Sequence, residues 1–451
     1  RLLKIIRPME YFDELNTSAG YSSEDEEHNP CIVGKEIPKD NYHQVKATFA
    51  LLGCATLLPW NFLVTPSNYW DYKFRNTTIP FDPERNSKTH LQTVWEAYIS
   101  IASNVPVAAA CLINAVVGQR FKIYPRLLGC CSFMLSVFIV LTCLVKIDSD
   151  SWINYFLLCT LALVFCLNGA SGLFQGALGG LVSKFSSGYI SILYVGQAVC
   201  GVLASVIEII VCWIVNDPLD SALIYFIIAD VMLLAATFSF IWVTKTEYYN
   251  YVMNKAMGDD LSVRYRELTM EEKPPLCDGN IVFKIKNEAI TVFLTFFVTL
   301  TVFPSIIVLV EPSNHTAWTE TFFKPVVCFL LFNASDLAGR LSANWIKKPG
   351  VGSNFLPLMS LLRIVFIPLI ILCNVQPRTN VPVVFHSDVI FILIIATLGL
   401  TNGYIANLAF IHAPLEVPPL DKERVGSVMV LFTVISTSLG AIVSSGFISM
   451  I

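Results

Sequence analysis

Charged residues are scarce in this chain of 451 residues. Only 14% are charged, 55% are hydrophobic, and the mean hydropathy is +0.62. A soluble domain carries about 25% charged residues, and a single water-soluble core would not bury this much apolar surface. The composition excludes a soluble globular protein and indicates a membrane protein. The net charge of -4 is too small and too dispersed to favour a nucleic-acid partner.

Motifs that would define other classes of membrane protein are also missing. No stretch has the Walker spacing of an ATP-driven pump. Asp230 and Asp336 stand in unlike contexts, so a pair of intramembrane protease aspartates is not indicated. The 13 cysteines, which lie in apolar runs apart from Cys31 and Cys277, show no metal or disulfide spacing. We expect no catalytic residues, no metal, no cofactor and no enzymatic activity.

Long apolar runs, by contrast, are abundant. Eleven are long enough to cross about 30 Å of hydrocarbon as helices, which predicts an all-α integral membrane protein with its termini on opposite sides. Residues 1–44 are polar and acidic rather than a cleavable signal peptide, and we expect a disordered tail there. The runs are centred near Gly53, Ala108, Val137, Val164, Val202, Met232, Val298, Leu330, Val365, Ala396 and Ile435.

Basic residues predict the orientation. Lysine and arginine collect in cytoplasmic loops, and most of the 30 basic residues lie in inner segments if the N-terminus is cytoplasmic. Two helical halves with spans broken by proline and glycine are typical of secondary transporters. We expect four parts: a cytoplasmic tail at 1–44, a six-helix bundle at 45–244, a cytoplasmic loop at 245–287, and a five-helix bundle at 288–451.

One glycosylation sequon lies in the predicted outer loop after the first run. It consists of Asn76, Thr77 and Thr78, and it is far enough from the membrane to accept a glycan. Such tripeptides also occur often by chance, so a glycoprotein modified at Asn76 and an unmodified loop both stay open.

The eighth run carries charges that a lipid-facing helix would exclude. In the stretch FNASDLAGR, Asn333, Asp336 and Arg340 are spaced i, i+3 and i+7 and share one helix stripe. Asp336 and Arg340 either neutralise each other or line a polar cavity and bind the hydroxyl groups of a solute. The high cost of charge within a membrane favours the cavity.

The fourth and first runs add further candidates. Glycines at four-residue intervals from Gly172 to Gly180 predict close packing of another helix. Beside them, Gln175 offers a donor and an acceptor, either for a heterocyclic base or for a neighbouring helix. In the first run, Pro59 predicts a bend that frees a carbonyl. Trp60 follows it and either stacks on an aromatic solute or anchors at the membrane interface.

Three more ionisable residues lie within the runs. Glu208 is a candidate for proton sensing, and its alternative is a neutral carboxyl bonded to a neighbouring helix. We expect Asp230 to be structural or at the edge of the cavity, and Arg363 to snorkel toward the cytoplasmic face. No set of carboxylates and carbonyls indicates a sodium site.

Seven motifs occur in an order that resembles one family. They are LLPWNF, LFQGALGG, VGQAVCG, the Phe303-Pro304 pair, FNASDLAGR, IPLIILCNVQPR and LTNGY. Together with the eleven runs, they resemble the equilibrative nucleoside transporters, solute carrier family 29, from Tyr42 to Ile451. The outer stretches NYWDYKFRNTT and VKIDSDSW look most like the endolysosomal branch of that family.

The resemblance implies a fold similar to the major facilitator class without its twelfth helix, in a 6+5 arrangement, and transport by alternating access. By similarity, Leu57 and Trp60 would shape the base end of the cavity, and Gln175 would bond the base. Asp336 and Arg340 would hold the ribose hydroxyls.

The resemblance also implies gates. Asn333 would lie close to the ribose, and the outer closure would include Asn61, Phe303 and Pro304. Arg126 and Glu423 would close the inner side, although Arg126 is equally explained as an ordinary inner-side basic residue.

Two departures from the family pattern limit what carries over. Ser171 replaces a glycine of the inhibitor-sensitive members, and Val64 replaces a frequent methionine. Inhibitor sensitivity and substrate ranking are therefore not implied.

The expected function is facilitative transport of purine and pyrimidine nucleosides such as adenosine and uridine, with nucleobases as a further class. The alternatives are a proton-coupled nucleoside carrier of endolysosomal membranes and a solute-sensing membrane protein that moves no cargo. Apart from the lipid bilayer, we expect no obligate partner. The plasma membrane is the expected location, with the late endosome or lysosome as the alternative. The C-terminus would be extracellular or lumenal.

Overall fold

A computed structural model describes residues 38–64, 66–77, 89–215, 217–269, 281–314, 316–376 and 382–450, and its elements are helices. The N-terminal half contains α3 (Gln44–Val64), α4 (Ser67–Lys73), α5 (His90–Val117), α6 (Ile123–Val145), α7 (Ile153–Val182), α8 (Ser187–Ile214) and α9 (Pro218–Val243). After α10 (Glu247–Thr269) and α11 (Ile281–Lys284), the C-terminal half contains α12 (Lys286–Val302), α13 (Ala317–Phe323), α14 (Leu331–Trp345), α15 (Phe355–Leu362), α16 (Phe366–Ile371), α17 (Asp388–His412) and α18 (Lys422–Met450).

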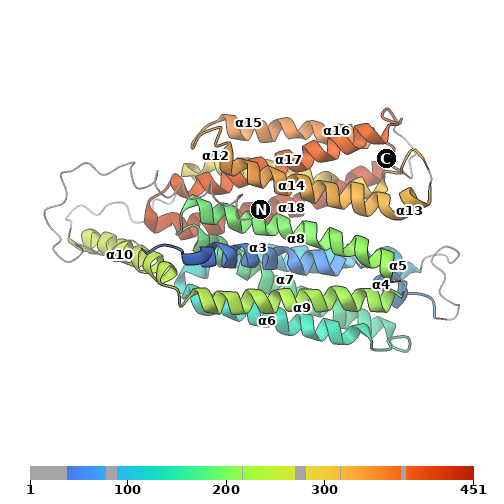
Figure 1. Ribbon diagram of the computed structural model, residues 1–451, viewed down its shortest axis with the longest axis horizontal. Coiled ribbons are helices and arrows are strands. Elements are labelled where there is room, and N and C mark those ends of the chain that lie inside the picture. The colour runs from blue at the N-terminus through green and yellow to red at the C-terminus, as the bar shows by residue number, and fades with distance from the viewer. Residues whose placement is uncertain are drawn as a thin grey trace.

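The two halves lie side by side with their helices running along the long axis of the molecule (Figure 1). Across the boundary, α8 packs on α14 and α17, while α18 packs on α5 and α7. The described chain begins at the end of the molecule where α10 lies, and α18 ends at the opposite end, near α13 (Figure 1). An odd number of crossings requires this arrangement.

Helices occupy all of the predicted positions. Among the described residues, nine helices are long and apolar enough to cross a membrane, and Phe355–Ile371 is a shorter apolar segment. The all-α membrane fold is confirmed. The number of eleven crossings stays a prediction, as do the boundaries of the two halves.

The eighth predicted span is interrupted. Its first part is α13, its middle is the π-helical segment η5 (Lys324–Leu330), and its last part is the regular helix α14. Pro325 has no backbone N–H to donate to the preceding turn, which favours the wider π turn. Such turns are frequent at functional sites, and this one leads directly into the helix that carries Asp336 and Arg340.

The predicted cytoplasmic loop at 245–287 begins with a helix, α10, which covers 23 of its residues. Tyr249 of α10 is buried and packs against Phe185, with ring centroids 5.7 Å apart. Burial raises the pKa of Tyr249 to about 12. The aromatic contact joins the start of α10 to the turn between α7 and α8.

Glycines allow the central helices to approach closely. A Cβ on Gly403 of α17 would lie 1.9 Å from the Asp336 carbonyl oxygen of α14. A Cβ on Gly339 of α14 would lie 2.1 Å from the Leu400 carbonyl oxygen. Only residues without a side chain permit this separation, as in other close helix pairs of membrane proteins.

The predicted glycine ridge on α7 is confirmed as a packing surface. A Cβ on Gly172 would lie 2.7 Å from the Val107 carbonyl oxygen of α5, and one on Gly180 would lie 2.8 Å from the Glu423 carbonyl oxygen of α18. The ridge therefore supports one helix from each half.

Gly196 and Gly188 of α8 provide a matched test of this packing. A Cβ on Gly196 would lie 2.1 Å from the Ala50 carbonyl oxygen of α3, whereas one on Gly188 would meet nothing within 4 Å. We expect Gly196→Ala to lower the free energy of unfolding by about 1–3 kcal/mol through overpacking. Gly188→Ala should leave it unchanged or raise it, because alanine favours the helix. Thermal unfolding in detergent measures both, and equal midpoints would contradict the packing.

Candidate functional site

Asp336 and Arg340 form a buried ion pair on α14. Arg340 Nε donates to Asp336 Oδ2 at 2.8 Å, and the two residues are 4% and 5% exposed. The mutual neutralisation considered from the sequence therefore occurs. Burial of both charges in one geometry still requires hydrogen-bond partners for the remaining atoms.

Arg340 finds its further partners in the other half. Its Nη1 donates to the Tyr194 carbonyl oxygen at 2.8 Å and to Gln197 Oε1 at 3.4 Å, both on α8. Arg340 thereby joins the C-terminal half to the N-terminal half.

Asp336 finds its second partner within its own half. Asn402 Nδ2 of α17 donates to Asp336 Oδ1 at 2.6 Å, and Thr299 Oγ1 of α12 donates to Asn402 Oδ1 at 2.8 Å. Arg363 Nη2 donates to Thr299 Oγ1 at 2.8 Å. Hydrogen bonds thus connect four side chains from four elements one after another.

The prediction that Arg363 snorkels is wrong. Its side chain is 2% exposed, and its guanidinium also donates to the carbonyl oxygens of Thr295 at 2.7 Å and Leu398 at 3.1 Å. Arg363 turns inward because two helices of its half, α12 and α17, offer acceptors there. The periodicity of one helix gives no information about such neighbours.

The connection continues into the N-terminal half. Gln197 Nε2 donates to Thr56 Oγ1 of α3 at 3.0 Å, and Gln175 Nε2 of α7 donates to the Thr56 carbonyl oxygen at 3.2 Å. That carbonyl lies three residues before Pro59, and Ser171 Oγ also donates to it at 3.3 Å. Two side chains of α7 therefore bond to one backbone carbonyl of α3.

We call this connected set the polar chain. It crosses both halves near the middle of the helices and consists of Gln175, Thr56, Gln197, Arg340, Asp336, Asn402, Thr299 and Arg363.

Asn333 lies beside the polar chain rather than in it. Its Nδ2 donates to the Gly201 carbonyl oxygen at 3.1 Å and to Ser205 Oγ at 3.0 Å, both on α8. The two ends of the stripe predicted from spacing, Asn333 and Arg340, therefore bond to α8, whereas Asp336 between them bonds to α17.

The aromatic and gate candidates of the first predicted span follow Thr56 on α3. Leu57 and Trp60 are half-buried, and Trp60 is one helical turn from Thr56 and so shares its face. The Asn61 amide lies 3.8 Å from Cys200 Sγ of α8.

The other outer-gate candidates lie against the site helix. Phe303 stacks on Phe332 with ring centroids 4.1 Å apart, and Pro304 follows it after α12. Phe332 directly precedes Asn333, so this stack adjoins one end of the site.

The inner-gate candidates Arg126 and Glu423 come together across the halves. Arg126 Nη2 lies 3.2 Å from Glu423 Oε1, and Lys184 Nζ lies 2.6 Å from Glu423 Oε2. All three side chains are at most 20% exposed. Two cations of the N-terminal half therefore hold one carboxylate of the C-terminal half.

The remaining candidates lie elsewhere. Glu208 is half-buried on α8. Asp230 accepts a bond from Thr142 Oγ1 at 2.7 Å, which links α9 to α6 within the first half and makes it structural. Asn76 is exposed after α4, and the last residue of its sequon, Thr78, lies outside the described residues.

Sequence reasoning missed several residues of the site. Gln197 and Asn402 stand in the quoted motifs VGQAVCG and LTNGY, so an uncharged polar side chain at the centre of an apolar motif was the available signal. Thr56, Thr299 and Lys184 carried no such signal, because threonine and terminal lysine are common in and beside membrane helices.

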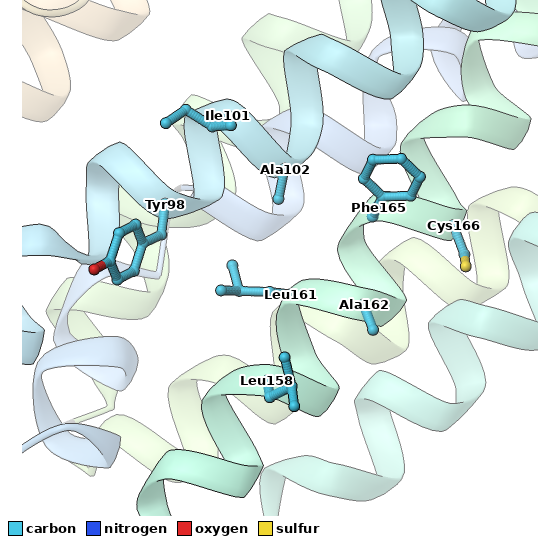
Figure 2. A pocket seen from close by; sticks show the side chains of 8 residues that line it. All are labelled: Tyr98, Ile101, Ala102, Leu158, Leu161, Ala162, Phe165 and Cys166. Carbon is cyan, nitrogen blue, oxygen red and sulfur yellow. The ribbon is translucent and has the colours of Figure 1, made fainter.

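A groove lined by α5 and α7 is apolar rather than polar. It measures about 490 Å³ and is lined by Tyr98, Ile101, Ala102, Leu158, Leu161, Ala162, Phe165 and Cys166 of α5 and α7. Figure 2 shows these side chains, among which the Tyr98 hydroxyl carries the one oxygen. A site for a polar solute needs several converging polar groups, which the polar chain has and this groove lacks.

Comparison with known proteins identifies the family. Residues 161–448 match the family model described as nucleoside transporter. Equilibrative nucleoside transporter 3 of Rattus norvegicus is 30% identical over 426 residues, which cover 90% of this chain and 89% of the relative. Equilibrative nucleoside transporter 1 of Homo sapiens is 29% identical, covering 90% and 97%. The chain belongs to the nucleoside transporter family.

Solved structures agree on the fold. The proton:xylose symporter XylE superimposes with a TM-score of 0.59 at 9% identity, covering 90% of this chain and 88% of that one. The human organic anion transporter MFSD10 gives 0.57 at 11% identity, covering 91% and 94%. The major-facilitator-like arrangement expected from the sequence is confirmed.

The ion pairs of Glu423 with Arg126 and Lys184 can be tested directly. Glu423→Gln removes the charge that both cations share, which should weaken the contact by about 1.4 kcal/mol. We expect amide hydrogen exchange across residues 422–430 to accelerate roughly tenfold. Asp421→Asn is the control, because it removes a nearby carboxylate and leaves the three-residue cluster intact. Unchanged exchange in Glu423→Gln would show that the cluster does not stabilise the start of α18.

Proposed function

We propose that this chain is a facilitative carrier that moves nucleosides across a membrane by alternating access. The observation that carries the proposal is the polar chain, which places donors and acceptors of both halves at mid-helix depth. A nucleoside presents a sugar with hydroxyl groups and a base with mixed donors and acceptors, and both kinds of partner are available there.

The proposed contacts follow from the chemistry of each side chain. The Asp336 carboxylate accepts from ribose hydroxyls and Arg340 donates to them, while Asn333 lies beside this end. Gln175 bonds the edge of the base through its amide. Trp60 stacks on the base, and Leu57 covers it.

Alternation uses contacts that join the halves. Arg340 bonds to α8, and Glu423 bonds to Arg126 and Lys184. When the inner end opens, the Glu423 cluster separates, and the outer end closes through Asn61, Phe303 and Pro304. A bound substrate shifts the equilibrium between the inward-open and outward-open conformations only through contacts that differ between them.

The substrates, the orientation and the location of the protein are part of the same proposal. Adenosine and uridine are substrates, and no catalytic activity or obligate protein partner is involved. The α10 end faces the cytoplasm, and the opposite end, with Asn76 as a glycosylation site, faces the exterior or lumen. The plasma membrane is the proposed location, with the late endosome or lysosome as the alternative.

One observation favours coupling to protons as a second candidate. Glu208 is half-buried on α8, three residues after Ser205, whose hydroxyl accepts a bond from Asn333. Residues at i and i+3 share a helix face, so this carboxyl lies near the site. A proton on Glu208 would then travel with the nucleoside.

Reconstituted liposomes test the proposal. We expect radiolabelled uridine and adenosine to equilibrate without a pH gradient. Asp336→Asn and Arg340→Lys should each reduce uptake more than about 100-fold. Asp336→Asn leaves the buried Arg340 charge uncompensated, at a cost of about 3–5 kcal/mol. Arg340→Lys keeps the charge but loses the guanidinium fork that bonds both Asp336 and α8. Asp230→Asn is the control, since it changes an intramembrane carboxylate away from the polar chain.

The outcomes separate the hypotheses. Uptake only from an acidic source side, abolished by Glu208→Gln, would replace the facilitative mechanism with proton coupling. Binding without uptake would indicate a sensor. Full uptake by folded Asp336→Asn and Arg340→Lys proteins would refute the assigned sugar site.

A further inference from the structure

Arg363 is a buried cation with four acceptors among the described residues, and all four are uncharged. They are the carbonyl oxygens of Thr295 and Leu398 and the hydroxyl oxygens of Thr299 and Thr401, at 2.7 to 3.2 Å. A guanidinium without a carboxylate on it is costly to bury. Thr299 and Asn402 connect it to Asp336, which indicates a function for this buried charge.

Arg363 imposes a direction on the hydrogen bonds. A guanidinium only donates, so Thr299 Oγ1 must accept from Arg363 and has one hydrogen left. Two acceptors compete for that hydrogen, the Thr295 carbonyl oxygen at 2.9 Å and Asn402 Oδ1 at 2.8 Å. Arg363 already donates to the Thr295 carbonyl, which leaves Asn402 as the better acceptor.

The same order of donors and acceptors extends to Asp336. Because Asn402 Oδ1 accepts from Thr299, its Nδ2 is turned to Asp336 and donates to Oδ1 at 2.6 Å. With the amide reversed, its oxygen would face the carboxylate, and two acceptors would oppose each other. Arg340 holds the other oxygen, Oδ2. The carboxylate is thus fixed from both sides.

We propose that Arg363 and Thr299 are positioning residues for transport, which orient Asn402 so that the Asp336 carboxylate is aimed at a sugar hydroxyl. This inference rests on the proposed function, because it concerns how the assigned sugar site is oriented. It adds two substrate-affinity determinants, Thr299 and Arg363, which are separated from the residue that touches the sugar by one and two intervening side chains.

Thr299→Val tests this without removing a charge. Valine keeps the shape of threonine and lacks the hydroxyl, so the link between Arg363 and Asn402 is broken. The control is Thr301→Val on the same helix, because Thr301 is equally buried and bonds to the Phe297 carbonyl oxygen at 2.8 Å. Thr299→Ser restores the hydroxyl and should restore the KM of the parent protein for uridine.

The measurement is uptake of uridine, 2′-deoxyuridine and 3′-deoxyuridine by reconstituted protein. We expect Thr299→Val to raise KM for uridine about tenfold, as for one lost buried hydrogen bond, with the maximal rate within about twofold. For the analogue that lacks the hydroxyl bound by Asp336, KM of the variant and the parent should agree within about twofold. Thr301→Val should leave all three values unchanged.

Two results would overturn the inference while uridine transport by the parent protein stands. One is a Thr299→Val protein that behaves like Thr301→Val with every substrate. The other is an equal rise of KM for uridine and both analogues, which is the effect of a general loss of packing. If the parent protein does not transport uridine at all, the proposed function fails, and this inference fails with it.

Discussion

The buried ion pair of Asp336 and Arg340 is the interaction on which the rest of the site depends. Two charges inside a membrane protein are tolerated only when each is paired and its other atoms are bonded. Asn402 of α17 supplies this for Asp336, and α8 supplies it for Arg340. Three helices must therefore meet at one depth, and Gly339 and Gly403 leave the space for α14 and α17 to do so.

The same pair lies on the boundary that an alternating carrier has to rearrange. Arg340 belongs to the C-terminal half and bonds to Tyr194 and Gln197 of the other. If the halves rotate about the site, these bonds must be exchanged for others of similar strength. In the account proposed above, sugar hydroxyls provide the replacement, so a bound substrate lowers the free-energy cost of the change between the two states.

Periodicity and composition predicted much of this structure. Apolar runs placed the helices, four-residue spacing placed the ridge on α7, and i, i+3, i+7 spacing placed Asn333, Asp336 and Arg340 on one stripe of α14. These features depend on a single helix. Partners depend on several helices, which is why Arg363 was misplaced and Gln197 was not recognised.

The interrupted eighth span and the helix α10 show a further limit of prediction from sequence. The π-helical segment at Lys324–Leu330 depends on how Pro325 meets its surroundings, and a hydropathy pattern reads the whole segment as one helix. Likewise, α10 was predicted only as part of a polar loop. Its first turn packs through Tyr249 on Phe185, and a contact between two separate segments cannot be derived from the hydropathy of either.

A structure determined with uridine bound tests the central claim most directly. The account predicts ribose hydroxyl oxygens at about 2.5–3.2 Å from the Asp336 carboxylate and the Arg340 guanidinium, with the base beside Gln175 and Trp60. It also predicts that Arg340 has given up at least one of its bonds to α8. A nucleoside bound elsewhere, with the bond from Arg340 to Tyr194 and the pair with Asp336 unchanged, would contradict it.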